Sequence, residues 1–250
     1  MISVIILSYN EEEVIEDCLK SVHDFADEII LVDSMSTDDT VKIAKKHKAR
    51  VVENILTSFS EQRNLGLEEA KGDWIYYLDA DERLTPDFIK EAKEIISAYD
   101  SSSRIAGYYV NRKTFYLNRD WHFTDKVQRL FYKSKLKEWY GAVHETPKVE
   151  GTYGVIESPI LHFTHRNLEQ MLEKTNKWSD YEAELRFKVD HPHMSWWRFP
   201  RVMIPEFFVA YIKQGGYKNG TEGLIESIYQ AFSMFIAYAK LWELQNKKKK

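Results

Sequence analysis

The stretch GDWIYYLDADERLTP, residues 72–86, joins an apolar run to a cluster of acids. Residues 74–78 are continuously apolar, which is typical of a buried strand, and Asp79, Asp81 and Glu82 follow at once. In an extended backbone, residues two positions apart point the same way, so we predict that Asp79 and Asp81 aim their carboxylates at one point. Such a pair suits a hard divalent cation, Mg²⁺ or Mn²⁺. A solvated turn is the alternative, because acid-x-acid triplets are common by chance.

Four strand-like segments with helical patterns between them indicate the order of elements in the first half of the chain. Apolar runs occupy residues 2–8, 28–32 and 74–78, and RVVE at residues 50–53 reads as a further short strand. They predict an α/β fold with a mostly parallel sheet flanked by helices, in which the carboxyl ends of the strands share one edge. Ligands bind at that edge in open α/β sheets. We therefore expect the polar residues after these strands to lie together: Ser8, Tyr9, Asn10, Asp33, Asp79 and Asp81.

The composition limits the classes of binding partner and the cellular compartment that we expect for the protein. The 250 residues suffice for one sizeable α/β core, or for one core with a helical appendage. A net charge of −4 argues against a nucleic-acid partner, and the single cysteine, Cys18, cannot form an internal disulfide. The apolar stretch at residues 227–239 is flanked by Glu226 and Lys240 before it is long enough to span a bilayer. No basic leader precedes the first apolar run, so we expect a cytoplasmic protein.

The segment after the first strand lacks a phosphate-binding loop. SYNEEE, residues 8–13, has no glycine and bears three acids, so it cannot form a glycine-lined phosphate cradle. A bound nucleotide diphosphate therefore needs another counter-charge, which a cation at Asp79 and Asp81 would supply. The acidic loop also argues against a sugar-phosphate nucleotidyltransferase, because those families have a glycine-rich, basic loop at this place.

Three blocks of the chain resemble the family 2 glycosyltransferases of the GT-A (Rossmann-like) fold. They are SVIILSYNEEEVIEDCLKSV, EIILVDSMSTDDT and QRNLGLEEAKGDWIYYLDADE, at residues 3–22, 28–40 and 62–82. Their order and spacing match the family. The resemblance implies a nucleotide-sugar donor, an inverting displacement at the anomeric carbon, and Mn²⁺ or Mg²⁺ held at the Asp-x-Asp triplet.

The resemblance also implies roles for single residues. Asp33 would hydrogen-bond the uracil base, Asp79 would meet the ribose or the donor sugar, and Asp81 would bind the metal. The residues implied on the donor side are Ser8, Tyr9, Asn10, Glu11, Asp33, Arg63, Asn64 and Asp79. For Arg63, a solvated surface position is the alternative.

The second half resembles a subgroup of bacterial transferases that add a hexose to the inner core of lipopolysaccharide or to related surface glycans. The resemblance is carried by TDKVQRLFYKSKLKEWYGAVHETP and ILHFTHRNLEQMLEKTNKW, residues 124–147 and 160–178. Positions that recur in the subgroup are here Asp125, residues 129–131, residues 143–145 and His162. Thr124 stands where the subgroup commonly has proline.

Glycosyl transfer needs a base, because a sugar hydroxyl is a poor nucleophile near neutral pH. We predict that Glu145 is this base, with Asp125 as the alternative, and that His144 orients the base or the acceptor. His162 either completes the metal shell with the two aspartates through a neutral nitrogen or, when protonated, hydrogen-bonds the diphosphate. A satisfied core histidine is the alternative, since His162 stands in the apolar segment PILHFTH.

The chain is expected to consist of two parts. Residues 1–166 are predicted to form the GT-A catalytic domain, with residues 1–90 binding the nucleotide sugar and residues 91–166 facing the acceptor. Residues 167–250 are predicted to be helical.

Within the helical part, residues 191–220 mix tryptophan and phenylalanine with arginine and lysine, and Pro200 and Pro205 are expected to break this segment. The mixture suits the headgroup region of a membrane. The alternatives are that the apolar residues pack on one another and on the catalytic domain, or that they join two subunits, so the oligomeric state stays open.

Taken together, the residues and the resemblance predict a metal-dependent inverting hexosyltransferase. It would move a hexose or N-acetylhexosamine from a UDP-sugar to a hydroxyl of a glycan or glycolipid acceptor, at the inner face of the cytoplasmic membrane. The acceptor would be a precursor of lipopolysaccharide core or of a related surface glycan. A catalytically inactive GT-A scaffold is the alternative from another class. Such a domain is expected to lack one of Asp79, Asp81 and Glu145, and all three are present.

Overall fold

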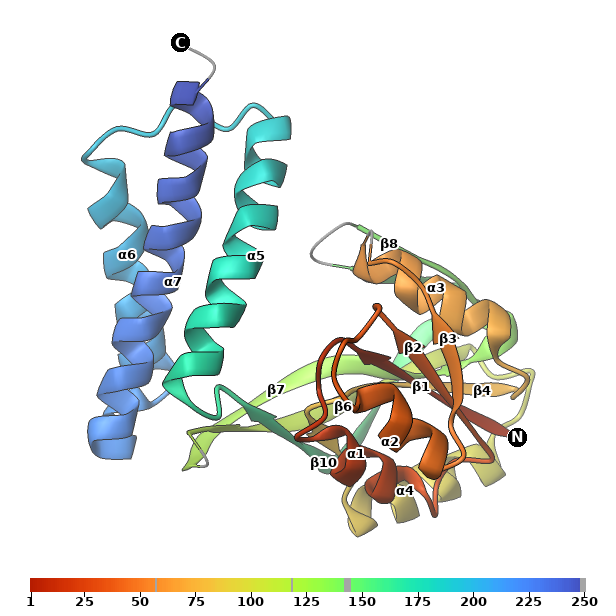
Figure 1. Cartoon of the computed structure of the whole chain (residues 1–250). Coiled ribbons are helices and arrows are strands. Elements are labelled where there is room, and N and C mark those ends of the chain that lie inside the picture. Colours follow the sequence, from red (N-terminus) through yellow and green to blue (C-terminus); the bar gives the residue numbers. More distant parts are fainter. Residues whose placement is uncertain (57, 118, 142–144, 248–250) are drawn as a thin grey trace. The chain divides into compact units, whose positions relative to one another are not determined.

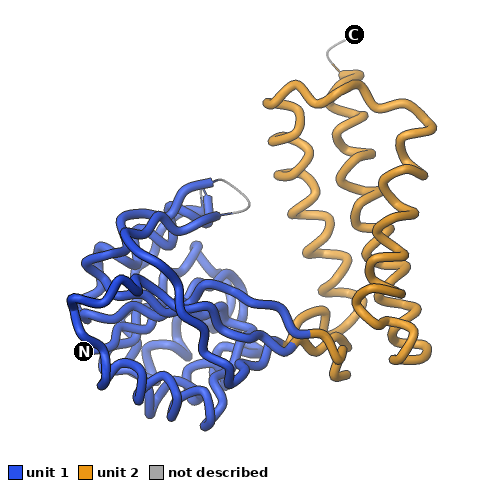
Figure 2. Tube along the Cα trace, turned by 180° about the vertical axis from the view of Figure 1, so that it is seen from behind, with its two compact units in different colours: residues 1–113, 124–162 blue, residues 114–123, 163–250 orange. Residues whose placement is uncertain are grey.

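The computed structural model of the chain describes residues 1–56, 58–117, 119–141 and 145–247 (Figure 1). The chain divides into two compact units, which Figure 2 colours separately. Unit 1 comprises residues 1–113 and 124–162, and unit 2 comprises residues 114–123 and 163–250. Residues 114–123 and 163–166 therefore group with the helices, whereas we expected them in the catalytic domain.

Unit 1 begins with the alternation of strands and helices that the sequence predicts. These elements are β1 (Ile2–Ser8), α1 (Ile15–Val22), β2 (Glu28–Asp33), α2 (Thr40–Lys46), β3 (Arg50–Glu53), α3 (Phe59–Glu69) and β4 (Trp74–Asp79). The following elements are β5 (Glu82–Arg83), α4 (Pro86–Ala98), β6 (Ile105–Tyr116), β7 (Arg119–Tyr132), β8 (Leu136–Tyr140), β9 (Thr146–Val149) and β10 (Thr152–Thr164). Of these, β6, β7 and β10 extend from unit 1 into unit 2.

The main sheet is mixed and has the strand order β3-β2-β1-β4-β7-β6-β10-β5. The first four strands pair in parallel, β7 runs antiparallel to β4, and β5 runs antiparallel to β10. In the parallel part, Ser8 pairs with Asp33 and Leu7 pairs with Asp79. The predicted α/β class, with helices flanking the sheet, is confirmed. The carboxyl ends of β1, β2 and β4 meet at one edge, as expected.

The sheet carries a hydrophobic core on each face. Alternate residues of β1 belong to different cores: Val4 and Ile6 pack with α1, α2 and α4, whereas Ile5 packs with α3 and β8. Figure 1 shows α3 on the opposite face of the sheet from the other three helices. Gly66 lets α3 approach the sheet, because a Cβ at this position would lie 2.5 Å from Cγ2 of Ile5.

Unit 2 is built mainly from helices, which confirms the predicted helical region. They are α5 (Leu168–Lys188), α6 (Arg198–Phe208) and α7 (Gly220–Lys247), with a π-helical turn at Val209–Lys213 and a 3₁₀ turn at Gly216–Asn219. A small core of Ala183, Met194 and Leu241 joins these segments. In addition, Nδ1 of His165 lies 2.8 Å from Oε1 of the buried Glu226, which links the residue after β10 to α7.

The expectation that two prolines break residues 191–220 is wrong for α6, which runs through both Pro200 and Pro205. Pro200 stands in the first turn, where backbone N–H groups have no acceptor within the helix, so proline is tolerated there. Beyond Pro205 the chain continues into the π-helical turn. None of the helices in the described part of the chain combines the length and the apolar composition that a membrane span requires.

Candidate active site

A buried carboxylate holds the loop after β2 against β1. Asp33 is fully buried and accepts hydrogen bonds from the Ser8 hydroxyl at 2.8 Å and from the backbone N–H and the hydroxyl of Ser36, each at 2.7 Å. These bonds fill three of the roughly four acceptor positions of a carboxylate. Asp33 thus lies at the expected edge, and its hydrogen bond to uracil stays a prediction.

The loops after β1 and β2 are also joined to each other. The amide oxygen of Asn10 accepts a hydrogen bond from the backbone N–H of Thr37 at 2.8 Å, and Glu11 donates its backbone N–H to the Thr40 hydroxyl at 2.8 Å. The adjacent Tyr9 side chain is exposed. The donor-side residues predicted after β1 therefore lie beside Asp33 at the same edge.

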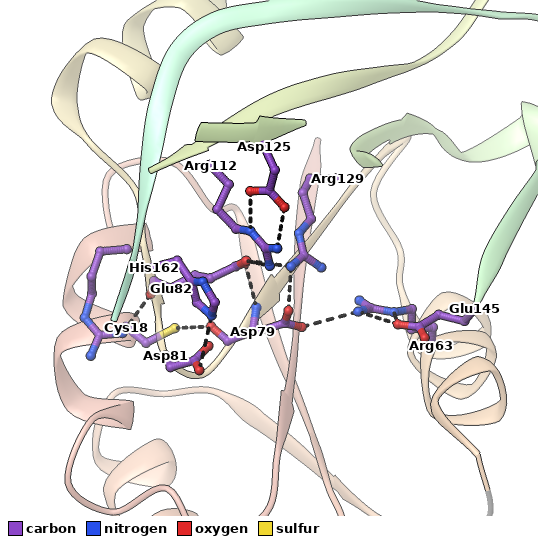
Figure 3. A network of polar contacts seen from close by, with 11 residues as sticks. Cys18, Arg63, Asp79, Asp81, Glu82, Arg112, Asp125, Arg129, Glu145 and His162 are labelled. Carbon is purple, nitrogen blue, oxygen red and sulfur yellow. Dashed lines mark hydrogen bonds and ion pairs between the residues drawn. The ribbon is translucent and has the colours of Figure 1, made fainter. Parts of the chain in front are cut away.

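Asp79, the last residue of β4, is held by two arginines (Figure 3). Its Oδ2 lies 2.5 Å from Nη2 of Arg129 in β7, and its Oδ1 lies 3.3 Å from Nη2 of Arg63 in α3. Both arginines are buried, at 4% and 5% exposure. Burial opposes ionisation of Asp79, but the charges of Arg129 and Arg63 outweigh it and hold the pKa of this carboxyl well below its usual range. Asp79 is therefore a fixed negative charge at neutral pH.

Arg63 connects Asp79 to the predicted base. Its Nε donates to Oε1 of Glu145 at 3.1 Å, and its Nη2 lies 3.0 Å from the same oxygen. The guanidinium also lies 4.9 Å from the ring centre of Trp139 and 5.4 Å from that of Tyr77. The solvated alternative for Arg63 is therefore wrong, because aromatic rings and carboxylates surround its head group.

The two predicted bases are held differently. Asp125 is bound through both oxygens by Arg112, with Nε donating to Oδ1 at 3.0 Å and Nη2 to Oδ2 at 2.6 Å. Glu145 contacts Arg63 through Oε1, and its Oε2 has no hydrogen-bond partner among the residues that the structure describes. The free oxygen favours Glu145 over Asp125 as a proton acceptor. His144 lies outside the described residues.

A buried glutamate connects the arginines behind Asp79. Glu82 is fully buried, and its Oε1 lies 2.6 Å from Nη2 of Arg129 and 3.4 Å from Nη1 of Arg112. Its Oε2 accepts a hydrogen bond from the backbone N–H of Asp79 at 3.1 Å. Burial disfavours the charge on Arg129, but Asp79 and Glu82 overcome this and raise the pKa of Arg129 well above its usual value.

Asp81 has a different partner from Asp79. Its Oδ2 lies 3.5 Å from Nε2 of His162, and the two side chains are only 14% and 15% exposed. Antiparallel pairing of β5 with β10 places His162 opposite Glu82, next to Asp81 (Figure 3). The structure therefore brings together two of the three residues predicted to bind metal.

The arrangement of Asp79 and Asp81 differs from our expectation that both carboxylates aim at one point. The strand β4 ends at Asp79 and residues 80 and 81 form a turn, so the alternation rule for an extended strand does not reach Asp81. Within the described residues, no group of three or more His, Cys, Asp or Glu side chains is placed to hold a metal ion. A carboxylate oxygen and an imidazole nitrogen nevertheless fit Mn²⁺ or Mg²⁺ if substrate oxygens and water complete the shell.

Two further side chains near the site support the fold. The amide of Asn64 donates to the backbone oxygen of Trp139 at 2.9 Å and accepts from its N–H at 2.7 Å, so it joins α3 to β8 with both polar atoms. The buried Cys18 lies with its Sγ 3.7 Å from the backbone oxygen of Asp79, and burial raises the pKa of its thiol. The donor contact predicted for Asn64 would require it to give up these bonds.

Sequence reasoning missed Arg112 and gave no role to Glu82 or Arg129. All three are charged residues in or beside strands, and charges at such positions are rare unless they are paired. That signal was present in the sequences of β5, β6 and β7, but the partners become visible only when the strands are paired.

Comparison with known proteins identifies the class. Residues 3–149 match the family described as Glycosyl transferase family 2. This segment is more than half of the chain, so the protein belongs to family 2 and is a glycosyltransferase, as predicted.

Curated relatives match nearly the whole chain. An uncharacterized glycosyltransferase of Rickettsia conorii is 29% identical, and the alignment covers 99% of this chain and 92% of the relative. The lipopolysaccharide core biosynthesis glycosyltransferase LpsC of Rhizobium meliloti is 26% identical, with 97% of this chain and 92% of the relative covered. The predicted resemblance to transferases of lipopolysaccharide core synthesis is confirmed.

Solved structures of glucosyl-3-phosphoglycerate synthase from Mycobacterium tuberculosis are also similar. The complex with phosphoglyceric acid is 20% identical with a TM-score of 0.47, covering 68% of this chain and 74% of that chain. The complex with Mn²⁺, UDP and glucosyl-3-phosphoglycerate is 28% identical with a TM-score of 0.37. That alignment covers 46% of this chain and 44% of the synthase chain, which is less than half of either.

Proposed function

We propose that this glycosyltransferase moves a hexose or an N-acetylhexosamine from a UDP-sugar to a hydroxyl of a lipopolysaccharide-core or related surface-glycan precursor, with inversion. The acceptor class is supported by the similarity to LpsC over nearly the full length of both chains. The observation that carries the proposal is that the Asp81–His162 pair, the arginine-bound Asp79 and Glu145 lie in one network of unit 1 (Figure 3).

Asp81 and His162 are the residues that would hold Mn²⁺ or Mg²⁺. The donor atoms are Oδ2 of Asp81 and Nε2 of His162, which are already close together. When bound, the cation supplies positive charge that stabilises the departing nucleotide diphosphate. Asp79, kept ionised by its arginines, would accept hydrogen bonds from hydroxyl groups of the donor.

Glu145 would accept the proton of the attacking hydroxyl. Arg63 holds one carboxylate oxygen and leaves the other to receive the proton, so the guanidinium orients the base without occupying both of its oxygens. Asp125 is the weaker candidate because Arg112 engages both of its oxygens. In this scheme the Arg112–Asp125 pair stabilises β6 and β7 rather than taking part in proton transfer.

Calorimetric titration of UDP into the purified protein tests the donor site. We expect binding in the presence of Mn²⁺ and loss of binding with EDTA or in Asp81→Ala. Asp73→Ala is the matched control, because Asp73 is an exposed aspartate whose side chain is 71% accessible. Equal binding with and without the cation would refute the metal part of the proposal. No binding under either condition would favour the inactive scaffold instead.

A further inference from the structure

The outer side of α6 carries an exposed row of apolar and basic side chains. None of the eleven residues of α6, all of which the structure describes, is buried. The exposed row consists of Trp197, Arg201, Ile204, Phe208 and Ile212, which we call the α6 stripe. Their spacing of three or four residues places them on one side of a helix.

The opposite side of α6 is already used for packing inside unit 2. The ring of Phe199 lies 5.6 Å from that of Phe235 in α7, and Phe199 also contacts the small core around Met194. The apolar residues of the α6 stripe are by contrast about half exposed: 43% for Trp197, 53% for Ile204 and 54% for Phe208. Contacts within unit 2 therefore leave the stripe uncovered.

The charges around the stripe are mainly basic. The guanidinium carbons of Arg198 and Arg201 lie 4.9 Å and 6.0 Å from the ring centre of Trp197. Lys213 follows at the end of the π-helical turn and is exposed. The acid within α6, Glu206, lies two residues beyond Ile204, about 200° around the helix and so on another side.

We propose that the α6 stripe binds the headgroup region of an anionic lipid surface. Tryptophan beside arginine suits this region, because the ring enters the interface while the guanidinium meets phosphate groups. The short helix would lie in the plane of the interface, with Ile204 and Phe208 directed to the acyl boundary. The charge of the stripe complements anionic lipid, which favours this occupant over a second copy of the same basic stripe. The inference does not depend on the proposed donor or acceptor.

Vesicle sedimentation tests this surface directly. We expect the full chain to sediment with vesicles of phosphatidylcholine and phosphatidylglycerol, less with phosphatidylcholine alone, and less at high salt because exposed charges are screened. The double variant Ile204→Gln with Phe208→Gln should bind at least about tenfold more weakly, since it removes apolar surface from the interface. Arg201→Gln should weaken binding roughly fivefold and reduce the salt dependence.

The matched control is Leu172→Gln with Ile228→Gln. These residues lie on α5 and α7, outside the stripe, and are 50% and 54% exposed. The control should bind vesicles like the unchanged chain. Equal binding by the stripe variant and the control would overturn the proposal, as would failure of the unchanged chain to sediment with anionic vesicles. A dimer that the stripe variant dissociates in sedimentation equilibrium would assign the stripe to a second copy. UDP titration of the same variants distinguishes a loss of vesicle binding from failure of the donor site.

Discussion

Asp79 and Asp81 are separated by one residue, yet the structure surrounds them differently. Asp79 is fixed between two buried arginines, and Asp81 faces the imidazole of His162. The first carboxylate is neutralised by arginine charges inside the protein, whereas the described contact of the second is with an imidazole nitrogen at 3.5 Å. The two acids of one Asp-x-Asp triplet can thus have different surroundings, with two arginines at the first and a histidine at the second.

The largest effect is expected when the ion pairs of Arg129 with Asp79 and Glu82 are removed. Arg129→Met leaves Asp79 and the fully buried Glu82 without their shared guanidinium, and removal of one partner from a buried pair costs about 3–5 kcal/mol. We expect a loss of this size in the free energy of unfolding, measured with urea at neutral pH.

The control for this prediction is Arg119→Met in the same strand. The Arg119 side chain is 65% exposed and lies 3.0 Å from Glu222, so its removal should cost less than about 1 kcal/mol. Similar losses in both variants would contradict the prediction, because Asp79 would then behave like an ordinary surface carboxylate.

The second prediction distinguishes the two candidate bases, Glu145 and Asp125, each of which is bound by an arginine. Glu145→Gln keeps the shape of the side chain but removes its basicity, so turnover should fall at least about 100-fold, the lower range for general-base catalysis. Asp125→Asn should cost less than Glu145→Gln in turnover. Single-turnover rates with a UDP-sugar and a lipopolysaccharide-core acceptor would measure both, and a greater loss in Asp125→Asn would exchange the two assignments.

The smallest expected effect concerns the pH dependence of stability. The pKa of Asp79 is lower in the folded state than in the unfolded state, where it is about 3.9. The ionised carboxyl therefore stabilises the fold above that unfolded pKa, and this stabilisation is lost as the pH falls through and below it. Asp79→Asn should therefore be less stable than the unchanged chain at neutral pH, and the difference should narrow in acid. Urea midpoints across the acid range would measure it. A stability difference between the two proteins that is the same at every pH would show that the arginines do not lower the pKa of Asp79.

The sequence was sufficient for the features that depend on local pattern. The apolar runs and helical periods predict β1 to β4 with their helices, and parallel pairing then places Asp33 and Asp79 at one edge. The ion-pair partners of Arg112 and Arg129 depend on how β6 and β7 pair with their neighbouring strands, and local periodicity does not determine that pairing. The orientation of Asp81 escaped prediction because a turn follows Asp79, and a turn has no fixed alternation of side chains.

Cys18 has a practical consequence for experiments on this protein. It is the single cysteine of the chain, it is buried in α1, and its raised pKa disfavours the reactive thiolate. A thiol introduced at an exposed position, such as Ile204→Cys, should therefore take a maleimide fluorophore selectively without prior removal of the native cysteine. Spectroscopic labelling can thus report on the chosen surface while the packing beneath Asp79 stays intact.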